Sequence, residues 1–406
     1  MWKLIAACLA LGSVSLLLPS EPSYDPLAWL IWGRELAQFH LDTSGGPSWK
    51  PLPVVFTTLT APFGQVDHGL PPALWMAVAR AGALLAMAFA FRLAHRLAGG
   101  GVAGILGGLV AALALFLTPD WFQFAAHGSE APIAVAFMLW AIERHLDGRV
   151  ADAVVLGTLA CLLRPELVPF LGLYGLWLWR AEPRLRKLVA GAFVLLPVLW
   201  VGPEWIGSGM PLGANLVEFS PLYDGNSTRF RLTVASWAGL VAAVLALALS
   251  ATAFVDHRVK RLRYEIGEVK ERMQIHADLA RAVHAAGGAN AVKAIGWSTT
   301  NRALQTRLAW ELGVPMELTE SLTDYRVVFR SSREPLVGRV YMTGRARHSQ
   351  TLVRVGTFRV YRRDGITFPR RRREWRLIRQ PFTGLLQGFH TSAGNGRIAR
   401  ARVVGR

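Results

Sequence analysis

Cysteine, histidine and charge are all scarce in this sequence. The only two cysteines, Cys8 and Cys161, lie in apolar segments, which excludes a disulfide framework. The histidines are few and scattered, and no Cys/His cluster has zinc spacing, so we predict neither a metal ion nor a cofactor. Charged residues make up 18% of the chain, fewer than the roughly 25% of ordinary soluble domains. The composition therefore disfavours a protein that is soluble throughout.

The charge that is present is divided unevenly. Residues 1–255 hold 15 Lys and Arg against 15 Asp and Glu, whereas residues 256–406 hold 30 against 12. We predict a membrane part over residues 1–255 and a small basic soluble α/β domain over 256–365, with strands at Tyr325–Phe329 and Leu352–Tyr361. An Arg/Gly-rich tail over 366–406 is expected to be disordered. No aromatic-interleaved basic motif is present, so we expect no nucleic-acid partner.

Long hydrophobic runs take the place of the missing charge. Runs of about 20 residues are candidate membrane spans. We predict an all-α polytopic membrane protein with about eight transmembrane helices, at Trp2–Leu18, Leu70–Leu93, Gly101–Leu117, Ala131–Ile142, Val150–Leu163, Leu167–Trp179, Leu188–Val201 and Val234–Val255. The first run is either a signal peptide or an uncleaved signal anchor. Pro19-Ser20-Glu21-Pro22 is a poor cleavage site, which favours the anchor.

The loops between these runs alternate in charge. Each even-numbered run is followed by basic residues, and the other loops are acidic. By the positive-inside rule the basic loops are cytoplasmic, so residues 19–70 face outward and residues 256–406 face inward. We therefore expect a multi-pass protein of a cell membrane, most simply a bacterial plasma membrane.

The first outward loop carries an acid at the start of a helix. Asp25 precedes Pro26, which predicts a helix over 26–40, and Lys50 precedes a second apolar segment over 51–64. Both segments are too short to span, so we predict two helices lying at the membrane interface. Asp25 is either a helix cap or a functional acid. Lys50 either contacts a phosphate or extends its ammonium to the lipid headgroups.

A charged tip interrupts the apolar pair 150–179. Its halves are too short to cross comfortably, and basic residues flank both outer ends, so we predict a hairpin. Arg164-Pro165-Glu166 forms the tip, at or below the outer surface. Charges at that depth are unfavourable unless they pair or line a wet cavity.

In order and spacing, these features resemble the GT-C membrane glycosyltransferases, in the branch of the protein mannosyltransferases and aminoarabinose transferases. The resemblance covers about residues 1–200. It rests on an acid opening a long first outer loop, on the segment Lys50–Gly64 followed by a span with a basic exit, on Glu130 opening the fourth span, and on Leu163-Arg164-Pro165-Glu166 between the fifth and sixth. The string Asp-Pro-Leu-Ala-Trp that begins at Asp25 also looks like actinobacterial members.

The resemblance implies a mechanism and its participants. The donor would be a polyprenyl-phosphate sugar, and a glycan, lipid or protein hydroxyl would be the acceptor. Asp25 would be the general base, Lys50 and Arg164 would hold the phosphate, and Glu130 and Glu166 would orient hydroxyl groups. Purely structural roles remain as alternatives. Arg164 could form a structural ion pair with Glu166, and Glu130 could cap the fourth span.

Two other functions stay open. The chain could be a non-catalytic, degenerate member whose basic domain binds anionic lipid or another partner. A transporter is disfavoured, because the polar residues gather in outer loops and no internal repeat is evident. The deciding feature is geometric: a transferase requires Asp25, Glu130 and Arg164 to converge.

Overall fold

A computed structural model describes residues 1–118, 120–209, 237–320, 325–340 and 346–366 of the chain, with backbone only for residues 237–258. The structure is mostly helical (72%) with a small C-terminal sheet, as predicted. The predicted disordered tail lies outside the described residues, apart from Ile366.

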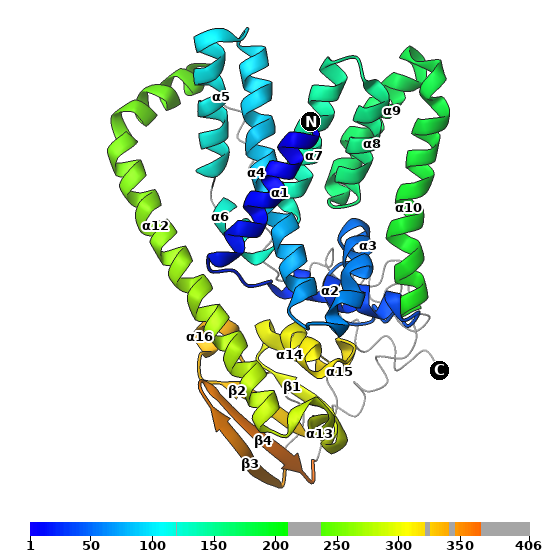
Figure 1. Cartoon of the computed structure of the whole chain (residues 1–406), viewed down its shortest axis with the longest axis vertical. Coiled ribbons are helices and arrows are strands. Elements are labelled where there is room, and N and C mark those ends of the chain that lie inside the picture. The colour runs from blue at the N-terminus through cyan, green and yellow to red at the C-terminus, as the bar shows by residue number, and fades with distance from the viewer. Residues whose placement is uncertain (119, 210–236, 321–324, 341–345, 367–406) are drawn as a thin grey trace, which may run out of the picture.

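Roughly parallel and antiparallel helices form the upper part of the molecule (Figure 1). They are α1 (Trp2–Val14), α4 (Leu70–Leu97), α5 (Gly101–Phe116), α7 (Ala131–Leu146), α8 (Val150–Cys161), α9 (Val168–Ala181) and α10 (Arg186–Ser208). Small residues let the helices approach closely. At Gly12 of α1, an added Cβ would lie 2.6 Å from the carbonyl oxygen of Ala77 in α4. The α8–α9 pair forms the predicted hairpin, and its tip is the 3-10 turn Pro165–Leu167.

The prediction of about eight spans is wrong for the described residues. Two helical segments are long and apolar enough to cross a membrane, α4 and Pro183–Ser208, and a third qualifies if α5 and the bent helix α6 (Trp121–His127) form one span. The other runs give shorter helices: α7, α8 and α9 have 16, 12 and 14 residues. At about 1.5 Å per residue these fall short of a core roughly 30 Å thick. The last predicted run, Val234–Val255, has no described side chains.

The first loop folds into α2 (Tyr24–Ala37), α3 (Pro51–Thr60) and a 3-10 turn, Ala61–Gln65, below the bundle. These elements lie close to the ranges predicted for two helices, 26–40 and 51–64. Residues 26–33 of α2 are all buried, so this helix packs on protein from every side. At Gly33 an added Cβ would lie 2.6 Å from the backbone of Thr57 in α3, which explains the glycine. Whether α3 lies at an interface stays a prediction.

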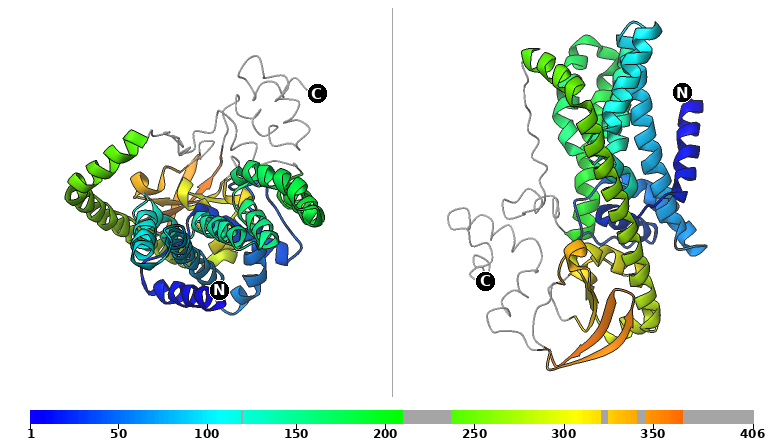
Figure 2. Two further views of the ribbon diagram at one scale, coloured as in Figure 1. Left: turned by 90° about the horizontal axis from the view of Figure 1, so that it is seen from above. Right: turned by 90° about the vertical axis from the view of Figure 1, so that its left-hand side faces the viewer.

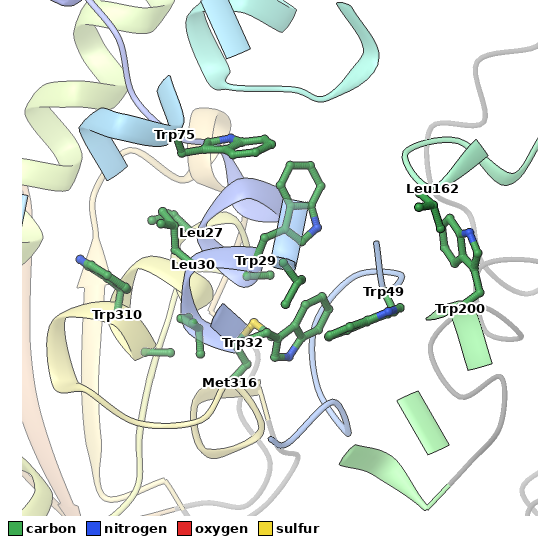
Figure 3. Packing of buried hydrophobic residues seen from close by; sticks show 14 of the residues in the cluster. Leu27, Trp29, Leu30, Trp32, Trp49, Trp75, Leu162, Trp200, Trp310 and Met316 are labelled. Atoms are coloured by element: carbon green, nitrogen blue, oxygen red, sulfur yellow. The ribbon is translucent and has the colours of Figure 1, made fainter. Parts of the chain in front are cut away.

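A tryptophan-rich core joins these helices to the rest of the chain. Figure 3 shows Trp29 and Trp32 of α2 between Trp75 of α4 and Trp49, with Met316 beside Trp32 and Trp310 to the left. The indole N–H groups of Trp75 and Trp49 donate to backbone carbonyls at 2.8 and 3.0 Å. Large aromatic side chains with a polar edge suit a site where a bundle meets another layer.

The C-terminal domain packs helices against one sheet. Its helices are α12 (Trp237–Ala285), α13 (Gly288–Ile295), α14 (Gln305–Leu312), α15 (Glu317–Glu320) and α16 (Glu334–Val337). Strands β1 (Ser298–Thr300), β2 (Val327–Ser331), β4 (Phe358–Asp364) and β3 (His348–Val355) follow one another across the sheet. The predicted single strand Leu352–Tyr361 is wrong, because the chain reverses at Gly356, where φ is +52°.

The domain lies at the end of the bundle opposite to the one predicted. It packs beneath α2, whereas the basic ends of α4, α7 and α9 lie at the top (Figures 1 and 2). Helix α12 has 49 residues and runs from the level of those basic ends down to the sheet. The charge-based placement had a weak basis for this domain, because the positive-inside rule is counted over short loops and says little about large domains.

Candidate functional site

Three predicted site residues, each the residue before a different helix or turn, meet in one ion cluster. Glu130 Oε1 lies 2.7 Å from Lys50 Nζ and 2.9 Å from Arg164 Nε. Glu130 and Lys50 are buried, whereas the Arg164 side chain is 35% exposed and also lies 3.6 Å from Glu166. The cluster therefore has a closed side and an open side.

Local backbone rules place each member. Lys50 precedes Pro51, which occupies the first turn of α3. Glu130 is the residue before α7, and Arg164 is held extended before Pro165, with φ −138° and ψ 101°. The amide of Leu52 donates to the carbonyl of Leu162 at 3.5 Å, which ties the start of α3 to the hairpin tip.

The contacts and the electrostatics bear on the alternatives that the sequence left open for Glu130, Lys50 and Arg164. Burial alone would raise the pKa of the Glu130 carboxyl, but the charges of Lys50 and Arg164 hold it below its usual value. Glu130 sits at the cap position of α7 without a capping hydrogen bond from its side chain. Lys50 turns inward to Glu130 rather than outward, and Arg164 pairs more closely with Glu130 than with Glu166.

The chain just before Asp25 is tied to the segment that leads to Glu130. The amides of Glu21 and Ser23 donate to the carbonyls of Ala126 and His127, at 3.1 and 3.0 Å, just before Glu130. Helix α2 begins at Tyr24, so Asp25 is inside its first turn and is not the N-cap residue, which is Ser23. One turn on, the ring of Trp29 lies 5.4 Å from Lys50 Nζ. The start of α2 and the ion cluster are therefore neighbours.

Trp29 is a candidate site residue that the sequence did not reveal. Its side chain is buried, and its indole Nε1 has no hydrogen-bond partner among the described residues. A buried polar atom without a partner is uncommon and calls for an explanation. In sequence Trp29 is one of several apolar aromatic residues in α2, and no signal separates it from the others.

An apolar cavity of about 320 Å³ has two lining residues, Cys161 and Leu167, that each lie three positions from Arg164 in the chain, but no residue of the ion cluster lines it. It lies between α7, α8 and α9, and Cys161 and Leu167 from the hairpin tip line one part of it. His145 and Tyr174, whose side chains are 2.9 Å apart, line another. Almost all of the lining is apolar, so the cavity suits a hydrocarbon chain.

Two further buried carboxylates lie on or near α2. Glu21 accepts from His276 Nδ1 at 2.5 Å and from Arg307 at 2.9 Å, both in the C-terminal domain. Glu35 accepts from the Asp42 amide at 3.1 Å, and its other oxygen has no partner among the described residues. Burial raises the pKa of the Glu35 carboxyl to about 7.

No three His, Cys, Asp or Glu side chains within the described ranges come together as a metal site. Comparison of the chain with protein-family models, with curated proteins and with solved structures finds no match.

Proposed function

We propose that this chain is a GT-C-type glycosyltransferase of a bacterial plasma membrane. It would cross the membrane several times and transfer a sugar from a polyprenyl-phosphate donor to an acceptor hydroxyl on the outer face. The observation that carries the proposal is the meeting of Lys50, Glu130 and Arg164 at a hairpin tip whose Cys161 and Leu167 line the apolar cavity of α7–α9. A charged cluster at a tip that also lines an apolar cavity suits a lipid that carries a phosphate.

The two halves of such a donor have matching surfaces. The isoprenoid chain would lie in the cavity, whose lining is apolar. Its phosphate would lie at the hairpin tip, where the partly exposed guanidinium of Arg164 offers paired N–H donors. Glu130 holds Arg164 and Lys50 in place, and Glu166, whose side chain is 65% exposed, would bind sugar or acceptor hydroxyl groups.

The proposed transfer step assigns one role to each of these residues. Asp25 takes the proton of the acceptor hydroxyl, and the acceptor oxygen forms a bond to the anomeric carbon. The bond between that carbon and the phosphate oxygen breaks, and the electron pair leaves with the polyprenyl phosphate. Lys50 and Arg164 stabilise the negative charge on the leaving group. The acceptor would be a glycan, a lipid or a protein.

The test is transfer by the full chain in membranes supplied with a panel of polyprenyl-phosphate sugars. Asp25→Asn should lower transfer by roughly 10²-fold or more, because the general base is lost. Asp67→Asn is the matched control, since Asp67 is an exposed acid of the same loop that caps the Gly69 amide at 2.7 Å. Full transfer by the Asp25→Asn protein would remove the assignment of the base, and no turnover of any donor would remove the function.

A non-catalytic role has one specific observation in its favour. The strand register places Arg330, Arg359 and Arg354 side by side on one face of the C-terminal sheet, and all three are exposed. Such a row attracts anionic lipid or another polyanion. Salt-sensitive binding of the full chain to anionic vesicles, lost on Arg359→Gln in a protein that transfers no sugar, would favour this role.

A further inference from the structure

A second cavity lies on the opposite side of α2 from Asp25. It has a volume of about 200 Å³ and is lined by α2, the 3-10 turn Ala61–Gln65, the start of α4 and Trp310 of α14. Arg34, which lines it, follows Asp25 by nine residues, or two and a half helical turns. This cavity is therefore separate from the Lys50–Glu130–Arg164 cluster.

Arg34 is the main charge of this cavity, and it has few partners. Its Nη2 donates to the Val314 carbonyl at 3.3 Å, and its guanidinium lies 5.4 Å from the centre of the Trp310 ring. Among the described residues it makes no ion pair. The neighbouring Glu35 is turned to another side of α2, where it accepts from the Asp42 amide. The charge of Glu35 attracts Arg34 but makes no ion pair with it, so an anion bound directly to this partly buried guanidinium would stabilise it further.

The rim of the cavity adds further polar groups. Gln38, Gln65 and His68 are exposed around it, so a ligand can enter from outside. The imidazole of His68 stacks on Trp310, with ring centres 4.4 Å apart. Two amides and an imidazole can donate hydrogen bonds, and the buried indole provides a flat apolar wall. Donors at the rim and a cation within describe a site for negatively charged oxygen atoms.

We propose that this cavity binds a small oxyanion, a carboxylate or phosphate group, with Arg34 as its principal ligand. The planar guanidinium fork matches two oxygens of such a group. The volume is below the roughly 300–1,000 Å³ of sites for drug-sized ligands, so the cavity accepts one small group. The site does not depend on the proposed sugar transfer, because none of its residues has a role in that reaction.

The oxyanion has two possible sources. One is a free small anion in solution. The other is a lipid headgroup, because the segment that lines the cavity also carries an exposed apolar stripe of Val55, Leu59, Phe63 and Val66. These residues recur every three or four positions, as one face of a helix requires. The chemistry at Arg34 is the same in both cases.

Binding to the full chain in lipid nanodiscs tests the site and its source. In nanodiscs of phosphatidylcholine alone, inorganic phosphate or glucuronate is titrated by calorimetry. In a second arm, thermal unfolding is compared between nanodiscs with and without phosphatidylglycerol. Arg34→Gln should weaken binding by roughly 10-fold to 100-fold, as expected for loss of a hydrogen-bonded charge. Arg34→Lys should bind the anion more weakly than the unmodified chain and more tightly than Arg34→Gln.

Three controls make the result specific. Arg302→Gln removes the same charge from an exposed position outside the arginine row of the sheet and should bind as the unmodified chain does. Arg164→Gln removes phosphate binding at the donor site, so the Arg34-dependent part must persist in it. Gln65→Ala, at the exposed rim, should weaken binding by a smaller factor and serves if Arg34→Gln does not fold.

The outcomes separate clearly. Arg34-dependent binding of phosphate or glucuronate identifies a free anion, and an Arg34-dependent effect of phosphatidylglycerol alone identifies a headgroup. The proposal is overturned if Arg34→Gln binds phosphate, glucuronate and phosphatidylglycerol as the unmodified chain does. If Arg34→Gln does not fold, the same result for Gln65→Ala overturns it. Equal losses in Arg302→Gln would also overturn it. An inactive transferase that still shows Arg34-dependent binding would leave the site standing.

Discussion

Glu130 and Glu35 are both almost fully buried, with 2% and 4% of their surface exposed, yet their surroundings act on them in opposite directions. Glu130 lies between Lys50 and Arg164, which come from two other elements, and its pKa is held low. Glu35 has a cationic neighbour in sequence, Arg34, but adjacent helical residues do not face each other. Its pKa is raised to about 7 by burial.

The difference shows that the fold places cations at selected acids and not at every acid. At Glu130 two cations gather and leave one guanidinium partly open at the hairpin tip. At Glu35 the available guanidinium is directed instead into the second cavity. Charge is therefore concentrated at two places where a ligand can enter, and Glu35, with a pKa of about 7, is about half protonated at neutral pH.

Breaking the Glu130 cluster should have the largest effect on stability. Glu130→Ala leaves Lys50 buried and Arg164 partly buried without their carboxylate, and removing one partner of a buried pair costs about 3–5 kcal/mol. We expect thermal unfolding at clearly lower temperature in detergent or nanodiscs. Glu166→Ala is the control, because this side chain is 65% exposed and should change stability by less than about 1 kcal/mol. Equal effects of the two substitutions would contradict the comparison.

Glu35 should give a smaller effect that depends on pH. Its folded pKa of about 7 exceeds its unfolded value, so the folded state holds more protons and stability falls as pH rises from about 4.5 to about 7. The shift corresponds to roughly 3 kcal/mol. Glu35→Gln should remove this dependence and unfold at higher temperature than the unmodified chain at pH 8. If the unfolding temperatures of the two proteins change with pH in the same way, the pKa of Glu35 is not raised by folding.

Glu21 is an intermediate case, because its two cationic partners belong to the C-terminal domain. Burial alone would raise its pKa, but the hydrogen bond from His276 and the charges of His276 and Arg307 hold it low. Glu21→Gln should weaken docking of that domain by about 1–3 kcal/mol. Faster amide exchange in α14 would report the change, and Glu334→Gln, at an exposed pair with Arg330, should leave that exchange unaltered.

Docking through Glu21 also has a pH dependence of known sign. Because the folded pKa lies below the unfolded value of about 4.3, the stabilisation is complete above that pH. It is lost as pH falls through the folded value. Exchange in α14 should therefore rise in the unmodified chain at acid pH and be less sensitive in Glu21→Gln.

The sequence predicted the positions of most bundle helices, because apolar runs and basic exits are local signals. It overestimated the spans, because short apolar runs were counted as crossings, and α7, α8 and α9 have only 16, 12 and 14 residues. It also placed the C-terminal domain at the wrong end, since charge counting cannot register the contacts of α2 with Trp310 and Met316.

The site divides in the same way. Lys50, Glu130 and Arg164 were predictable because each is a charge at the end of an apolar segment, where burial requires a partner. Arg34 and Glu35 are neighbours within the predicted helix at 26–40, and only tertiary packing shows that their side chains have different partners. Trp29 gave no signal, because an unpaired indole N–H is a property of its surroundings.

Arg164→Gln should have the smallest effect on stability and so separates function from structure within the cluster. Its side chain is 35% exposed, and Glu130 keeps Lys50 as a partner, so solvent screening should limit the loss to about 1 kcal/mol or less. Transfer should nevertheless fall by roughly 10²-fold, because the leaving phosphate loses a preorganised donor pair. Thermal unfolding and transfer measured on one preparation give both numbers. A loss of stability as large as that of Glu130→Ala, with transfer unchanged, would make Arg164 a structural residue and leave the cluster without an open side for a phosphate.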